Sequence, residues 1–137
     1  MTRLSLRTAL CGLLLCAACG QRTCQVSGTV TWEGQPIDDG TINLIPTDPT
    51  VPAVSTRIVA GKYTITTLPG AKKVEIWASR AVGEFLPHMG MHAREMYIPE
   101  EYNARSVLEV EVRAARANHF SFDLPIQPRE PTWPPTP

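Results

Sequence analysis

From residue 25 onward, apolar and polar side chains alternate with a period of two along much of the chain. This period is typical of a β-strand with one buried and one exposed face, because successive side chains of a strand point to opposite sides. The clearest example is residues 25–32. Its odd positions are polar, and its even positions are Val26, Gly28, Val30 and Trp32. We therefore expect Trp32 to belong to the core.

Six further segments repeat this pattern, and most are bounded by turn-forming Gly, Pro or Asp residues. They are residues 40–46, 55–59, 62–68, 72–79, 107–112 and 119–124. The residues expected to face inward are Ile42, Leu44, Val74, Ile76, Ala78, Leu108, Val110, Val112, Phe120, Phe122 and Leu124. Residues 80–103 lack a clear period, and we expect them to be irregular. Seven short strands at this spacing predict an all-β, antiparallel β-sandwich of immunoglobulin or transthyretin-like type.

The first 24 residues have a different pattern and hold all four cysteines, Cys11, Cys16, Cys19 and Cys24. Arg3 and Arg7 precede an apolar run over residues 8–18. This order is typical of a secretory signal peptide, and the run is too short to span a bilayer about 30 Å thick. Since no cysteine follows residue 24, a disulfide framework within the domain is not expected.

The end of the apolar run, Leu15-Cys16-Ala17-Ala18-Cys19-Gly20, resembles the lipobox of bacterial lipoproteins. In that family the cysteine thiol is diacylated, the signal is cut just before the cysteine, and the new amino group is acylated. Cys19 alone among the cysteines follows two small residues, although Cys16 stands where the lipobox usually has Leu. We expect lipidation at Cys19, with ordinary signal-peptidase cleavage near Gly20 as the alternative. The choice between inner and outer membrane stays open.

Composition limits the possible functions of the rest of the chain. The 137 residues include 43% hydrophobic and 19% charged side chains, which is enough apolar material for one small folded domain. Thirteen basic residues balance thirteen acidic ones. Because no basic excess exists to attract phosphates, nucleic acid is not an expected partner.

Three stretches of the chain carry a resemblance to a known family. They are VSGTVTWEGQPI at 26–37, GTINLIP at 40–46 and GKYTI at 61–65. These stretches resemble carboxypeptidase-regulatory-like domains, which are also described as transthyretin-like or prealbumin-like. Residues 98–103 and 118–124 resemble the small lipoproteins with this domain in planctomycete-type bacteria. The resemblance covers residues 25–124 and implies a seven-stranded Greek-key sandwich with a non-catalytic binding or scaffolding role.

Catalytic motifs are not found in the sequence. It has no Gly-x-Ser-x-Gly, no phosphate-binding glycine loop and no His-Glu-x-x-His. A hydrolase of 5-hydroxyisourate shares the transthyretin fold and relies on His, Arg and a C-terminal Tyr-Arg-Gly-Ser, whereas this chain ends Pro-Pro-Thr-Pro. We therefore expect no enzymatic activity and no cofactor, and an envelope hydrolase is the least favoured alternative.

Two features are candidates for ligand binding. The cluster His88, Met89, Met91 and His92 supplies imidazole and thioether groups, which suit a soft ion such as Cu(I). We favour the other interpretation, a loop that caps the sandwich, buries the methionines and leaves the histidines in water. Trp77 shares the outward face of Lys73 and Glu75, so it is the candidate for an exposed anchor that stacks on a ligand such as a glycan.

The two acidic pairs, Asp38-Asp39 and Glu100-Glu101, are expected to be solvated turn residues, with a Ca²⁺ site as the less favoured alternative. Six of the thirteen prolines lie in residues 125–137, and we expect this tail to be a disordered end with polyproline II character.

The expected organisation is a signal peptide at 1–18, a lipidated tether at 19–24, a β-sandwich at 25–124 and the proline-rich tail. It predicts an exported cell-envelope protein, anchored in a membrane by lipid, whose partner is an envelope protein or a glycan.

Overall fold

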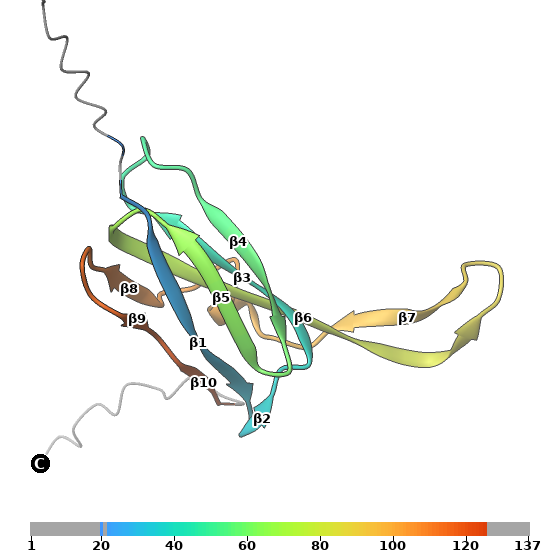
Figure 1. Cartoon of the computed structure of the whole chain (residues 1–137). Helices are drawn as coiled ribbons and strands as arrows, with labels where there is room; N and C mark the ends of the chain where they lie inside the picture. Colours follow the sequence, from blue (N-terminus) through green and yellow to red (C-terminus); the bar gives the residue numbers. More distant parts are fainter. Residues whose placement is uncertain (1–19, 21, 126–137) are drawn as a thin grey trace, which may run out of the picture.

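The computed structural model describes residue 20 and residues 22–125, and this part of the chain is all-β (Figure 1). The expectations for the signal peptide, for Cys19 and for the tail beyond Pro125 lie outside the described residues. No helix within the described residues is long and apolar enough to cross a membrane.

Ten strands and one short 3₁₀ helix make up the described chain. They are β1 (Cys24–Trp32), β2 (Gln35–Pro36), β3 (Asp39–Pro46), β4 (Val54–Val59), β5 (Lys62–Thr67), β6 (Gly70–Leu86), β7 (Met91–Met96), the 3₁₀ helix η1 (Glu100–Tyr102), β8 (Glu109–Val112), β9 (Asn118–His119) and β10 (Phe122–Leu124). All seven expected strands are present, and the last of them is divided into β9 and β10. Cys24, which was expected to lie before the domain, is the first residue of β1 and pairs with Thr67.

The strands form one curled sheet in the order β10-β1-β5-β4-β3-β6-β7. The sheet is antiparallel except where β9 and β10 pair in parallel with β1. β4 and β5 share a single registered pair, Val59 with Lys62, next to the turn that joins them. At the other end, β8 pairs with β6 and β9 pairs with β1, so residues 113–117 connect the two parts of the sheet.

The inward positions expected from the alternation form the core. Val26, Val30, Ile42, Val74 and Ile76 have no exposed surface, and their neighbours of the same parity are buried or half-buried. Burial of apolar area at about 25 cal/mol per Å² provides the main stabilising term for such a domain.

Gly28 lets two parts of the curled sheet come together. A β-carbon at this position would lie 1.7 Å from the carbonyl oxygen of Phe120, so no other residue fits without a backbone shift. The Phe120 backbone is held there, because its N–H donates to the Ser27 carbonyl at 2.9 Å and its carbonyl accepts from the Tyr63 hydroxyl at 2.7 Å. The glycine thus permits the contact that places β9 and β10 beside β1.

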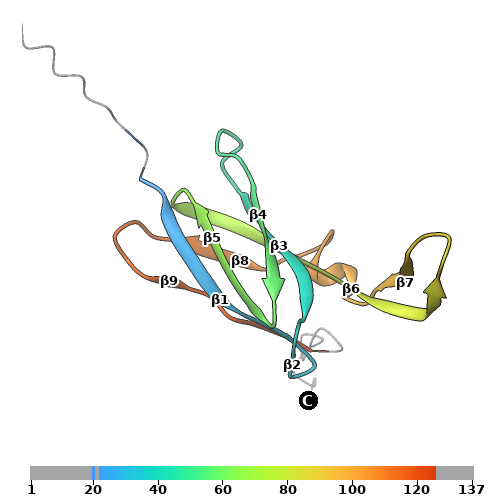
Figure 2. The ribbon, with the colours of Figure 1, turned by 45° about the vertical axis from the view of Figure 1, so that its right-hand side comes forward.

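The expectation that residues 80–103 are irregular is wrong for residues 80–86 and 91–96, which form strands. β6 runs for 17 residues and continues past the body of the sheet, where it pairs with β7 in a hairpin that projects outward in both views (Figures 1 and 2). We call residues 79–96 the arm. Every residue of β7 is exposed, so no buried face imposes a period of two on its sequence. A register shift between Val82 and Phe85 interrupts the pattern further.

Candidate functional site

A cleft lies at the root of the arm, where β6 leaves the body of the sheet. Its volume is about 530 Å³. Trp32 and the β2 turn line one part of it, and the first residues of the arm together with Tyr97 line another. We call this space the root cleft.

Aromatic side chains form one wall of the root cleft. The rings of Trp32 and Tyr97 meet edge to face with centroids 6.4 Å apart, and Tyr102 packs on Trp32 at the same centroid distance. The guanidinium of Arg80 lies 5.6 Å above the Tyr97 ring, a cation–π contact. Trp32 therefore has two roles. It packs against the core as expected, and its half-buried ring also lines the cleft.

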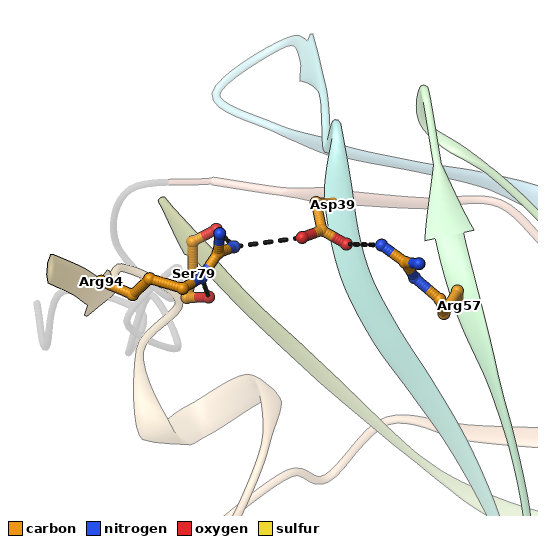
Figure 3. A network of polar contacts seen from close by, with 4 residues as sticks. All are labelled: Asp39, Arg57, Ser79 and Arg94. Carbon is orange, nitrogen blue, oxygen red and sulfur yellow. Dashed lines mark hydrogen bonds and ion pairs between the residues drawn. The ribbon is translucent and has the colours of Figure 1, made fainter. Parts of the chain in front are cut away.

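A polar network ties the arm to the body at the same place (Figure 3). Asp39, at the start of β3, accepts from Arg57 at 2.7 Å and from Arg94 of the arm at 3.1 Å. Arg94 also donates to the Ser79 hydroxyl and to the Ser79 carbonyl, each at 2.9 Å. Asp39 is therefore more than the solvated turn residue expected from the sequence. It bridges two arginines from separate strands.

These charges shift the pKa values of groups in the cleft. The hydrogen bond and charge of Arg57 lower the pKa of Asp39 below its usual 3.8, and Arg94 contributes in the same direction. Burial raises the pKa of Tyr97, and the nearby carboxylates of Asp38 and Asp39 add to the rise while Arg80 opposes it. Asp39 is thus ionised and Tyr97 is a neutral hydroxyl at physiological pH.

The second acidic pair behaves as solvated turn residues should. Glu100 and Glu101 belong to η1, and their carboxylates lie 3.1 and 3.5 Å from the guanidinium of Arg105. All three side chains are largely exposed, so these ion pairs contribute little to stability.

Trp77 lines an outer hollow of about 230 Å³ that adjoins the root cleft, with which it shares Asp39, Ser79 and Arg94. Thr41 of β3 and Met96 of β7 line the hollow beside it. The indole is half-buried and faces outward, as its parity predicts. Its role as a ligand anchor stays a prediction.

The Met/His cluster lies at the far end of the arm. The preferred interpretation, a packed cap over the sandwich, is wrong, because Met89 and Met91 are 60% and 51% exposed. Both histidines are exposed as expected. His92 lies edge to face with Phe85 at 5.5 Å, and its Nδ1 is 3.2 Å from the Gly83 carbonyl oxygen. The hairpin carries these side chains into solvent, because every residue of β7 is exposed and this strand pairs in the sheet with β6 alone.

Among the described residues, no three His, Cys, Asp or Glu side chains come together as metal ligands. The Cu(I) hypothesis for His88, Met89, Met91 and His92 depends on thioether ligands and stays a prediction.

One Ser–His contact lies on the exposed surface of the sheet. The imidazole of His119 is 3.5 Å from the Ser27 hydroxyl and 3.4 Å from that of Ser121. Among the described residues no carboxylate bonds to this imidazole, and the nearby Asp123 instead accepts from Thr31 at 2.6 Å. The contact therefore lacks the group that would orient and activate the histidine as a base.

The largest fully buried side chain of the domain is Lys72, which is 1% exposed. Burial lowers its pKa, while the charges of Asp48 and Glu111 oppose that shift. Cys24, a free cysteine in the described part of the chain, is buried near this lysine. The alternation along β6 places Lys72 on the same inward face as Val74. Because lysine is charged, its burial could not be predicted from hydrophobicity.

Sequence reasoning did not find the root cleft. Two of its polar members, Asp39 and Arg94, are 55 positions apart in the sequence, and only the fold brings them together, with Arg57 of β4 on the other side of Asp39. Comparison of the chain with protein-family models, curated proteins and solved structures finds no match.

Proposed function

We propose that this protein is a lipid-anchored, non-catalytic module of a bacterial cell envelope that binds a partner through its arm and root cleft. The observation that carries the proposal is the spacing between Cys19 and the fold. β1 begins five residues after Cys19, so a lipid on that cysteine would hold the sheet close to the membrane. Several acyl chains, at roughly 0.8 kcal/mol per buried CH₂, make such an anchor nearly permanent.

The direction of the arm supports a binding role. β6 begins at Gly70, close to the β1 end of the sheet that would face the membrane, because Cys24 pairs with Thr67. At about 3.3 Å per residue its 17 residues extend about 55 Å. A protein anchored at Cys19 would therefore present the exposed end of the arm well away from the lipid, where an envelope protein or a glycan could reach it.

The family resemblance fits the same proposal. We propose that the curled sheet is a Greek-key sandwich of the carboxypeptidase-regulatory-like, transthyretin-like class, as the motifs at 26–37, 40–46 and 61–65 imply. In carboxypeptidases such domains lie beside the enzyme and do no chemistry, which agrees with a binding or scaffolding role. An experimental structure in which the strands were connected differently would refute this assignment.

Detergent partitioning tests the anchor. The full chain, expressed in a Gram-negative host, is expected in the detergent phase, and the Cys19→Ala variant is expected in the aqueous phase or as uncleaved precursor. Cys11→Ala, which removes a thiol from the same segment, is the matched control and should partition like the wild type. Equal partitioning of all three proteins would refute lipidation at Cys19.

Copper binding at the end of the arm is a second candidate function, favoured by the exposure of both methionines and both histidines. We expect calorimetry with Cu(I) to give a binding isotherm with the wild type and none with the double variant His88→Ala, His92→Ala. Because both histidines are exposed, this variant should keep its fold. Equal heats for the two proteins would eliminate the site.

A further inference from the structure

We propose that the root cleft binds the proline-rich C-terminal segment of its own chain, residues 126–137. The inference adds an occupant to the cleft and does not depend on the lipid anchor. It rests on where the described chain ends, on the chemistry of the cleft wall and on the spacing of the prolines.

The described chain ends at the margin of the root cleft. Leu124 pairs with Trp32, and its carbonyl accepts from the backbone N–H of Glu33 at 3.0 Å. Trp32 and Glu33 both line the cleft. The next residue, Pro125, accepts from the Tyr102 hydroxyl at 3.4 Å, and Tyr102 packs on Trp32. The twelve residues that follow therefore start beside the aromatic wall and need no long linker to reach it.

The prolines of this segment have a regular spacing. Pro128, Pro131, Pro134 and Pro137 occur at every third position. A polyproline II helix has three residues per turn, so all four rings would lie along one face, about 9 Å apart. Proline-rich segments of this form dock in grooves lined by aromatic side chains, and their low entropy in the free state favours binding. The edge-to-face pair of Trp32 and Tyr97 supplies such a wall.

The root cleft holds acidic side chains that one basic residue of the segment would pair with. Glu33 and Asp38 line the root cleft and make no ion pair with any described residue. Arg129 follows the first of the four spaced prolines and could reach these carboxylates. Arg80 and Arg94, in contrast, already pair with Glu95 and Asp39. The segment also holds Glu130, so its side chains have no net charge, and the complementarity lies in the single pairing of Arg129 with Glu33 and Asp38.

Binding in cis needs little intrinsic affinity. A short connection gives an effective concentration on the order of 1 mM. A segment that binds in trans with a dissociation constant of about 0.1 mM would then be about tenfold more bound than free. A partner for the root cleft would have to displace it, so the segment would act as an internal competitor.

Nuclear magnetic resonance of the indole N–H groups tests the proposal in the full chain. The three tryptophans report separate places, since Trp32 lines the root cleft, Trp77 lies in the outer hollow and Trp133 belongs to the segment. Ending the chain after Pro125 should shift the Trp32 signal and leave the Trp77 signal unchanged. A synthetic peptide of residues 126–137, added to the shortened protein, should return Trp32 to its position in the full chain.

A charge reversal in the cleft provides a matched pair of variants. Asp38→Lys, at an exposed position of the cleft, should weaken binding of the peptide at least fivefold. Glu84→Lys, at an exposed position of the arm, should leave it unchanged. The proposal would be overturned if neither the truncation nor the added peptide shifted the Trp32 signal. So would equal peptide affinity in the two charge variants. Neither result would affect the partitioning expected from Cys19.

Discussion

At the scale of single residues, the burial of Lys72 is the feature that we expect to lower the stability of the fold. An inward lysine between Val74 and the buried Cys24 carries a desolvation cost that nearby carboxylates offset in part. We expect Lys72→Met to raise the free energy of unfolding by about 1 kcal/mol, because methionine fills a similar volume without a charge. Urea denaturation measures the change.

The neighbouring lysine is the control for this prediction. Lys73 points to the outer face and pairs at 2.8 Å with Glu75, whose side chain is 14% exposed, so Lys73→Met should lower the free energy of unfolding by up to about 1 kcal/mol, opposite in sign to Lys72→Met. The pH dependence gives a second readout. Because the folded-state pKa of Lys72 is lowered, stability should rise with pH as it approaches 10.5, and Lys72→Met should remove that rise. Destabilisation by Lys72→Met would show that the buried charge is favourable.

The raised pKa of Tyr63 predicts that the protein loses stability at alkaline pH. Burial raises its pKa far above the usual 10.0, and its hydroxyl donates to the Phe120 carbonyl. Its contribution is complete below pH 10 and is lost as the pH rises toward the folded-state pKa, because the unfolded chain ionises first. Tyr63→Phe should cost about 1 kcal/mol at pH 7 and should flatten the decline above pH 10. Denaturant titrations at pH 7 to 11 measure both effects, and an unchanged decline in Tyr63→Phe would contradict this assignment.

At the scale of elements, the arm marks the limit of what the alternation could predict. Strands with one buried face, such as β1, β3 and β5, were predicted because every second side chain faces the core, which favours an apolar residue there. β7 has no buried face, and its sequence Met-His-Ala-Arg-Glu-Met carries no such constraint. The polar contacts at the root of the arm join residues up to 55 positions apart, which no local pattern reveals.

The arm should be held at its root by Arg94. We expect Arg94→Ala to increase amide hydrogen exchange in residues 79–86 and 91–96, because the contacts to Asp39 and Ser79 are lost. Global stability should change little, since both partners are exposed. Arg105→Ala removes two comparable surface ion pairs elsewhere and should leave exchange in the arm unchanged. Equal exchange in the two variants would show that backbone pairing alone holds the arm.

Acid should loosen the same contact. The folded-state pKa of Asp39 is lowered, so its bonds to Arg57 and Arg94 persist above the ordinary value of 3.8 and are lost as the pH falls through the lowered value. Exchange in the arm should therefore rise, relative to the body, at pH values below 3.8, and Asp39→Asn should show the raised exchange already at pH 6. An arm whose relative protection did not depend on pH would contradict this role of Asp39.

At the scale of the whole molecule, the sequence predicted an all-β domain and most of its core but not where its concave surfaces lie. Periodicity identifies the buried side of each strand. It does not say which strand ends meet, so Trp32 could be predicted as a core residue while its place in the cleft could not. The proposed lipid anchor is different, because Cys19 and the apolar run before it form a local sequence pattern that does not depend on the fold.

The most direct test of the central claim is the mass of the N-terminal peptide of the mature protein purified from membranes. Cleavage before Cys19 and trypsin digestion after Arg22 would give the peptide Cys-Gly-Gln-Arg. We predict that this peptide carries a diacylglyceryl group on the thiol, with or without a third acyl chain on the amine. An unmodified N-terminus at Gly20 or beyond, or an intact precursor, would contradict the lipid anchor.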